Sequence, residues 1–274
     1  MKSKVFFLIV CCFLCFGANA QSFREDFMQA LNKKDMKQME AVLKAWDLNN
    51  ANDPELYVAF FNFYTLKSMD AGTLSKNGYD TSNSKQALEF ISEGIERFPS
   101  RLDMRIAKIY MLGALNNYHD YVEEIIVLIA FSHKIQNQWK HEDFLSVSYP
   151  EEIFYGIVAD GQEFLFSKED PSLFNDIIRI SNEMLKYYPT HTQSRIAISM
   201  VHVARKENEK ALTMLLNGVN FDPTNAVLLF NIAYLYHIKE DKVNAKKYFE
   251  LTVTHCNDKE ADLKEAAQKL LKEI

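Results

Sequence analysis

The spacing of the apolar residues constrains this chain more than any other feature. From Phe23 onward apolar residues recur every three or four positions, and strict alternation over more than a few residues is absent. This period matches one face of an α-helix, whereas a half-buried strand alternates every two residues. The 274 residues include only 8 Gly and 6 Pro, which leaves little material for the tight turns of a many-stranded sheet. We therefore predict an all-α fold.

The predicted helices are short, because turn signals interrupt the periodic pattern at short intervals. Pro54, Pro150 and Pro171 each stand where a first helical residue is expected. The pattern predicts helices at 22–32, 35–47, 54–68, 84–97, 101–115, 118–135, 150–167, 171–187, 191–206, 208–220, 225–239, 241–255 and 258–272. Helices of this length need tertiary packing of their apolar faces to be stable, so they must lie side by side.

A repeat is visible in the last third of the chain. Ala211 and Ala245 are 34 residues apart, and so are Pro189 and Pro223. The stretch Leu229-x2-Ile232-Ala233-x2-Tyr236, followed by Ala245-x3-Phe249, resembles the pattern W-x2-L-G-x2-Y and A-x3-F of the tetratricopeptide repeat (TPR) family. Trp is absent from its family position. Farther upstream, Ala87-x3-Ile91 and Pro99 keep the twelve-residue distance from alanine to proline that separates Ala211 from Pro223.

The resemblance implies an all-α, TPR-like right-handed superhelix of stacked antiparallel helix pairs. We expect about six pairs and a C-terminal capping helix, in a single TPR-like α-solenoid domain over residues 21–274, with irregular insertions near 69–83 and 136–149. In such a fold Ala211 and Ala245 lie where two helices approach most closely, while Phe249 fills the gap to the neighbouring unit.

The sequence lacks the familiar motifs of nucleotide-binding, metal-binding and nucleophilic catalytic sites. Neither G-x-G-x-x-G nor G-x4-G-K-S/T occurs, there is no H-E-x-x-H, and Cys256 follows His255 directly on a predicted helix, where adjacent residues face different sides. The net charge of −6 argues against a nucleic-acid partner, whose binding depends on Lys and Arg. We therefore expect no catalytic residues, no cofactor and no metal site.

The resemblance implies a binding surface instead, because the first helices of TPR pairs line a concave groove that holds a peptide or a partner's helix. The inward positions are expected at Ile106, Tyr110, Gln162, Phe166, Ile196, Met200, Phe230 and Tyr234. These residues are mostly apolar, which favours an extended apolar peptide or another envelope protein as the partner. Of the residues that clamp a C-terminal carboxylate in chaperone-type TPR proteins, only Asn231 falls on such a position. Ordinary core packing is the alternative explanation of this aromatic stripe.

A second function remains open at the aromatic stretch 136–149. Trp139, His141, Phe144 and Tyr149 could stack on a ligand, as in a carbohydrate-binding or enzyme-associated accessory protein. An enzyme with a site at this loop is a third possibility.

The first twenty residues have the pattern of a secretory signal. Lys2 and Lys4 precede an apolar run over 5–16, and the small residues of Gly17-Ala18-Asn19-Ala20 follow. The run is shorter than the roughly 20 residues that a membrane span needs. We expect cleavage after Ala20, a periplasmic or secreted protein without a membrane span, and a mature chain whose one cysteine is Cys256.

Export is tested by the intact mass of the protein purified from the cell that produces it. A mature chain that begins at Gln21 is expected, because signal peptidase accepts small residues before the cleavage point. A product that keeps Met1, or that carries an acyl chain on Cys15, contradicts this expectation.

Overall fold

The structure is a computed structural model that describes residues 18–70, 79–140 and 150–274. Helices make up nearly all of this part of the chain, which contains no strand longer than one isolated bridge between Arg101 and Lys140. The chain divides into two compact units, residues 1–154 and 155–274, and each is described by itself.

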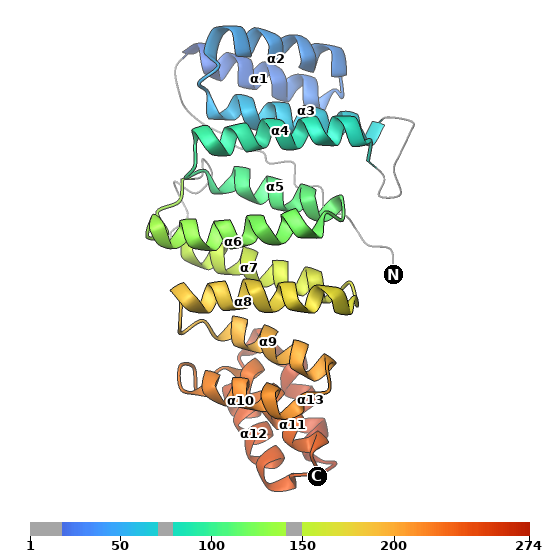
Figure 1. The fold of residues 1–274 in the computed structure, drawn as a ribbon, viewed down its shortest axis with the longest axis vertical. Helices are drawn as coiled ribbons and strands as arrows, with labels where there is room; N and C mark the ends of the chain where they lie inside the picture. Colours follow the sequence, from blue (N-terminus) through green and yellow to red (C-terminus); the bar gives the residue numbers. More distant parts are fainter. Residues whose placement is uncertain (1–17, 71–78, 141–149) are drawn as a thin grey trace. The chain divides into compact units, whose positions relative to one another are not determined.

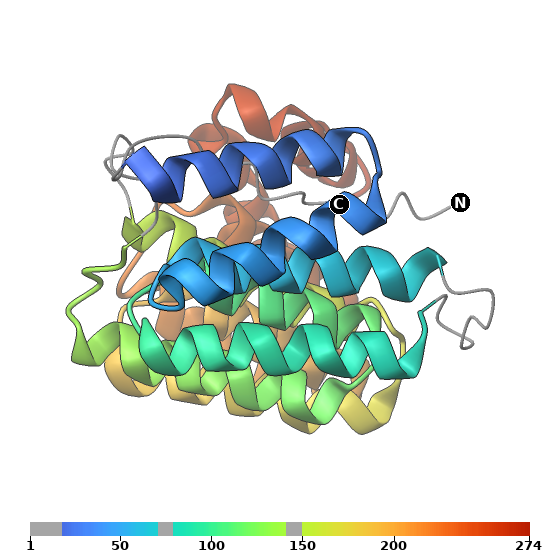
Figure 2. The same ribbon diagram turned by 90° about the horizontal axis from the view of Figure 1, so that it is seen from above.

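The first unit consists of consecutive helices (Figure 1). They are α1 (Ala18–Asn32), α2 (Met36–Asn50), α3 (Pro54–Asp70), α4 (Thr81–Arg97), α5 (Leu102–Ala114) and α6 (Tyr118–Lys134). The unit ends inside α7 (Pro150–Phe166). Each helix from α1 to α6 packs against the next one in the chain, and α3 and α4 lie side by side along most of their length (Figure 2).

The second unit begins in α7 and continues the same arrangement. Its further elements are the 3-10 turn η2 (Pro171–Leu173), α8 (Phe174–Tyr187), α9 (Thr192–Ala204), α10 (Asn208–Val219), α11 (Ala226–Ile238), α12 (Lys242–His255), η3 (Asp258–Glu260) and α13 (Ala261–Leu271). The final helix packs against α12 and α11, in the position expected of a cap. The all-α, TPR-like fold predicted from the sequence is confirmed.

The helix boundaries lie within a few residues of the predicted ones. The largest difference is the start of α1 at Ala18, four residues before the predicted one; the end of α2 at Asn50 and the start of α4 at Thr81 each differ by three residues. Both expected insertions fall partly outside the described residues, which omit 71–78 and 141–149. Helix α1 begins at Ala18, and cleavage after Ala20 stays a prediction.

One type of turn recurs inside the helix pairs. A residue with positive φ ends the first helix, and the second helix of the pair begins shortly after it; the positive-φ residues of these turns are Lys34, Asn116, Glu169, Lys206 and Glu240. Lys206 and Glu240 are 34 residues apart, at the repeat distance.

Hydrogen bonds close this turn in the same way in successive pairs. In the last pair the amide of Glu240 donates to His237 O and that of Asp241 to Tyr236 O, and the amides of Lys206 and Glu207 repeat the pattern on Val203 and His202. This is the Schellman arrangement, in which two orphan carbonyls of a helix end are satisfied. The Asp241 carboxylate accepts hydrogen bonds from the side-chain amide and the backbone amide of Asn244, which lower the pKa of Asp241, and the backbone bond caps α12. Two helices joined by so short a turn must run antiparallel.

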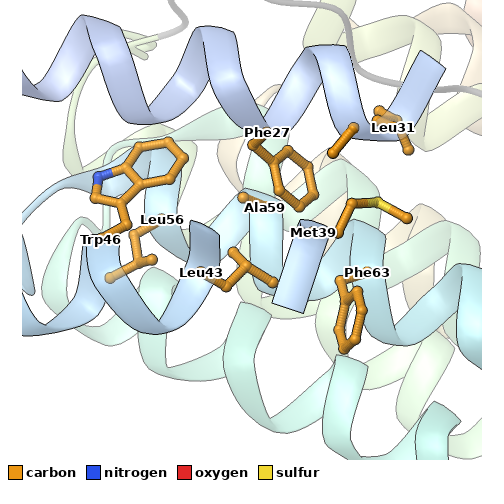
Figure 3. Close-up of a cluster of buried hydrophobic side chains, with 9 residues drawn as sticks. Phe27, Leu31, Met39, Leu43, Trp46, Leu56, Ala59 and Phe63 are labelled. Atoms are coloured by element: carbon orange, nitrogen blue, oxygen red, sulfur yellow. The ribbon is translucent and has the colours of Figure 1, made fainter. Parts of the chain in front are cut away.

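The core of the first unit begins with three helices that bury their apolar faces on one another. Figure 3 shows Phe27 and Leu31 of α1, Met39, Leu43 and Trp46 of α2, and Leu56, Ala59 and Phe63 of α3 pointing toward one another. The Trp46 indole also donates to Asp53 Oδ2 at 3.1 Å, so the one polar atom of this buried ring has a partner.

Small residues mark the places where helices approach closely. A Cβ atom added to Gly94 of α4 would lie 2.8 Å from Cβ of Tyr57 in α3, so only glycine fits there. In the second unit Ala211, Ala233 and Ala245 are fully buried, as the repeat predicts. Phe249 is fully buried as well and meets Phe230 edge to face, with ring centroids 5.6 Å apart.

Substitutions in α12 test this packing. Ala245→Leu should lower the free energy of unfolding by roughly 1–3 kcal/mol, because the close approach cannot hold a larger side chain. Phe249→Ala should lower it by roughly 3–5 kcal/mol through lost burial and a cavity. Urea unfolding measures both.

Val243→Ala is the matched control, because Val243 lies on the same helix with 81% of its surface exposed. Its free energy of unfolding should stay within about 0.5 kcal/mol of the parent. If all three variants unfold like the parent, the packing of α12 described above is wrong.

Candidate functional site

Three of the eight predicted groove residues are exposed. Tyr110 of α5 exposes 54% of its surface, Met200 of α9 39% and Tyr234 of α11 44%. Ile106, Phe166 and Phe230 are half-buried. The Phe230 ring stacks on Tyr234 with an interplanar angle of 7°, so the two form one aromatic edge along α11.

The other two predicted groove residues are buried and cannot line an open surface. Ile196 lies in a core cluster with Leu228 and Ile232 of α11, which cover that end of α9. The Gln162 amide Nε2 donates to Ser181 Oγ at 2.7 Å, inside the pair α7 and α8. Both residues were expected to line the groove, but the helical period alone does not show which part of a helix face a neighbouring helix covers.

Three further apolar side chains on the same two helices are exposed and were not predicted. They are Val203 of α9 and Val227 and Ile238 of α11. Val203 is three residues from Met200, and Val227 and Ile238 are seven and four residues from Tyr234, which are spacings of one helix face. Extension of the predicted positions by these spacings would have found them. We call Met200, Val203, Val227, Tyr234 and Ile238 the exposed apolar stripe.

In the alternative loop site at 136–149, the tryptophan is not available to a ligand. Trp139 is buried: its indole Nε1 donates to Ser132 Oγ at 3.0 Å, and its ring lies 5.4 Å from that of Phe131. The neighbouring backbone is held in place too, since the amide of Lys140 donates to Ser100 O and that of Leu102 to Lys140 O. A ring packed in this way cannot stack on a sugar. His141, Phe144 and Tyr149 lie outside the described residues.

An arginine recurs at one position in both units. Arg105 and Arg195 each stand six residues after a proline, Pro99 and Pro189, and are 90 residues apart. Each guanidinium donates to the carbonyl of its proline, at 3.4 Å from Arg105 Nε and 2.6 Å from Arg195 Nη2. We call this arrangement the arginine staple.

An aromatic ring completes the staple. Arg105 lies over Phe131 with its guanidinium carbon 4.9 Å from the ring centre, and Arg195 lies over Phe221 at 4.4 Å. Phe131 and Phe221 are again 90 residues apart, near the end of the second helix of each pair. The staple therefore ties the first helix to the preceding turn and to its partner helix. Such a cation–π contact contributes about 2 kcal/mol where it is desolvated and about 0.5–1 kcal/mol where it is exposed, as at Phe221.

The two staples differ in their charge balance. Arg105 Nη1 donates to Glu124 Oε1 at 3.0 Å, and Lys108 Nζ lies 2.9 Å from Glu124 Oε2. Arg195 instead donates to His191 O, and the part of the chain that the structure describes gives it no carboxylate within 4 Å. Burial lowers the pKa of both guanidinium groups, and Glu124 opposes this at Arg105.

A second buried ion network lies in the first unit. Arg101 binds both carboxylate oxygens of Asp103, at 2.8 and 2.6 Å, and Glu55 Oε1 at 2.6 Å. Burial alone would lower the pKa of Arg101, but these two carboxylates hold it above its usual range. Because every charge has an opposite partner, the network stabilises the junction of α3 and α5 and is no open site. Sequence reasoning missed it, since partners 46 residues apart leave no local pattern.

Residues 18–70, 79–140 and 150–274 contain no cluster of three His, Cys, Asp or Glu side chains able to hold a metal ion. No helix in these ranges is long and apolar enough to cross a membrane. The Cys256 thiol is half-buried, and burial raises its pKa, which keeps it protonated and a poor nucleophile.

Removal of the two arginines should separate their roles. Arg105→Met should lower the free energy of unfolding by about 3 kcal/mol, because Glu124 keeps only Lys108 as a partner. Arg195→Met should cost about 1–2 kcal/mol, the loss of charged hydrogen bonds without a stranded carboxylate. Urea unfolding gives both values.

The double variant Arg105→Met/Glu124→Leu is the control for the stranded carboxylate. It should recover most of the loss, because an apolar pair replaces the ion pair at little net cost. Equal losses in the two single variants, with no recovery in the double one, would contradict the charge difference between the staples.

Comparison with known proteins finds similarity to solved structures of TPR proteins at low sequence identity. No protein family matches the sequence, and no curated protein is found to be similar to it. The C-terminal part of a TPR repeat-containing protein from Cytophaga hutchinsonii covers 90% of this chain and 85% of its own, with 12% identity and a TM-score of 0.49. The match to YrrB, a TPR protein with an unusual peptide-binding site, covers 83% of this chain and 97% of YrrB, with 15% identity and a TM-score of 0.43. The match to a thermophilic TPR protein from Thermus thermophilus covers 92% of this chain and 98% of that protein, with 13% identity and a TM-score of 0.30.

Proposed function

We propose that this chain is an exported, non-catalytic TPR-type scaffold or adaptor, and that it binds an extended apolar peptide or another envelope protein on the exposed apolar stripe of α9 and α11. The observation that carries this proposal is the stripe itself: five large apolar side chains open to solvent on the first helices of two successive pairs. Apolar surface that a soluble protein leaves open to solvent can mark a protein interaction site.

The composition of α11 supports the proposal. This helix is apolar on almost every side, and Leu228, Leu229, Ile232 and Leu235 are buried within the second unit. A helix that is hydrophobic all round is normally covered all round. Its remaining face, with Val227, Tyr234 and Ile238, is not covered within the unit. A partner would complete the burial of α11.

The partner's chemistry follows from the charges of the two helices. Neither α9 nor α11 contains an acidic residue, and the one arginine between them, Arg195, is buried in its staple. Gln193 and Asn231 on these helices are uncharged at every pH, and the histidines His202 and His237 are half-buried, with His202 Nδ1 2.7 Å from Glu207 Oε2. An uncharged surface favours an apolar partner segment, because a charged one would lose hydration without gaining a counter-charge.

In the first unit, Tyr110 of α5 is the corresponding exposed aromatic residue. It lies on the first helix of a pair, as Tyr234 does. We include it in the test as a separate position.

Photo-cross-linking identifies the partner and tests the stripe. A benzophenone amino acid in place of Tyr234 should cross-link an envelope protein in the producing cell, whereas the same group in place of Val243 should not. Val243 is the more exposed of the two positions, at 81% against 44%, so accessibility alone favours the control.

Alanine variants then measure the contribution to affinity for the cross-linked protein. Tyr234→Ala should weaken binding about 30-fold, the effect of about 2 kcal/mol at an aromatic anchor, and Tyr110→Ala tests the first unit as a separate position. Their melting temperatures should stay within a few degrees of the parent, because an exposed side chain loses little burial when it is truncated. Val243→Ala should change neither value.

Two results would contradict the proposal. If Tyr234→Ala unfolds the protein, this ring belongs to the core. If Tyr234→Ala and Val243→Ala bind equally well, the stripe is not the site.

A further inference from the structure

His191 caps the N-terminus of α9 with its side chain. Its Nδ1 accepts the backbone amide of Ser194 at 3.3 Å and lies 2.9 Å from Ser194 Oγ. The residue has the extended backbone conformation of an N-cap, with φ −66° and ψ 102°. Asn and Asp are the usual caps, and they fill this role in α2, α4, α6, α11 and α12. Among the described α-helices with a side-chain cap, α9 is the one whose cap acceptor is an imidazole, a group with an ordinary pKa near neutral pH.

The cap requires the neutral ring. Nδ1 can accept the Ser194 amide only while its lone pair is free, so the proton of neutral His191 must be on Nε2. A second proton on Nδ1 turns this atom into a donor. The Ser194 hydroxyl can reverse its role and accept, but the Ser194 amide cannot, and it loses its partner. Ser194 is fully buried, so water does not replace the lost bond without movement of the turn.

The surroundings of the ring also oppose a positive charge. The ring packs against Tyr155 of α7, with centroids 4.9 Å apart, and Tyr155 in turn meets Tyr188 of the turn before α9 at 5.6 Å. Arg195, one turn farther along α9, donates to the His191 carbonyl. Arg195 is the one charged group whose charge lowers the pKa of His191, and it is a cation.

We propose that His191 is an acid-sensitive latch: when its ring is protonated, it releases the N-terminus of α9 from its cap and loosens its own contact with Tyr155 of α7.

The direction of the pH effect follows from linkage. Burial first, and then Arg195, lower the pKa of His191 from 6.5 to about 4. A depressed pKa of a base means that the unfolded or released state binds the proton first. Stability is therefore complete above about pH 6.5, falls as the pH drops below that value, and reaches its lower limit below about pH 4.

Release of the α9 cap would affect the exposed apolar stripe, because Met200 and Val203 of the stripe are residues of α9. If the stripe binds a partner as proposed above, acid should weaken that binding. The latch itself does not depend on a partner and is tested without one.

Hydrogen exchange of the α9 amides in the full-length protein is the test. After correction for the intrinsic pH dependence of exchange, protection of residues 192–204 should fall about 20-fold between pH 7 and pH 5, the linkage expected for a pKa that drops from 6.5 to about 4. In His191→Asn the fall should be absent, because Asn keeps the cap and does not titrate. His119→Asn, at an exposed histidine of α6, should behave like the parent.

Nitrogen-15 spectra of the histidine rings in the unsubstituted protein give a readout that needs no variant. They should show that His191 carries its proton on Nε2 at pH 7. As the pH falls, the signal of the Ser194 amide should change over the same pH range as the signals of the His191 ring. The latch is overturned if parent and His191→Asn lose protection equally. It is also overturned if His191 becomes protonated while the Ser194 amide stays protected.

Discussion

The rest of this structure depends on the burial of each helix against the next, because none of these short helices can cover its own apolar face. Phe249 is surrounded in this way by α11 and α12, and Trp46 by the first three helices. Cys256 is the one cysteine after residue 15, so no disulfide can join two helices of the described chain. Stability therefore comes from packing. At roughly 25 cal/mol per Å² of apolar surface, a single large side chain such as Phe249 stabilises the fold by a few kcal/mol.

Polar contacts decide how the packed helices are aligned. The positive-φ turns set the antiparallel direction within a pair, and the arginine staples join a pair to the preceding turn. The staple keeps its proline carbonyl and its aromatic ring in both units, while its charge balance changes from Glu124 beside Arg105 to none beside Arg195. The two arginine staples thus share their geometry but differ in the charges around the arginine. The His191 cap lies in the same turn as the second staple, so the unbalanced cation and the titrating cap act on one another.

The sequence predicted the helices and the repeat because both depend on local spacing. It did not predict the turns, because their positive-φ positions hold Lys34, Lys206 and Glu240, where glycine would have been the recognisable signal. The ion network of Arg101 joins residues far apart in the sequence and has no pattern to find. Of the residues predicted to line a groove, Tyr110, Met200 and Tyr234 are exposed, whereas Ile196 is buried. Ile196 is four residues before Met200 and on nearly the same face, but α11 covers that end of α9, which is a tertiary fact.

The central claim is that the open face of α9 and α11 is where a partner binds. Methionine methyl groups report on this directly, since Met200 is exposed while Met39, Met104 and Met184 are fully buried. In methyl spectra recorded with the partner that cross-links at Tyr234, the account predicts a shifted or broadened Met200 signal and unchanged signals from the three buried residues. An unchanged Met200 signal at saturating partner would contradict it.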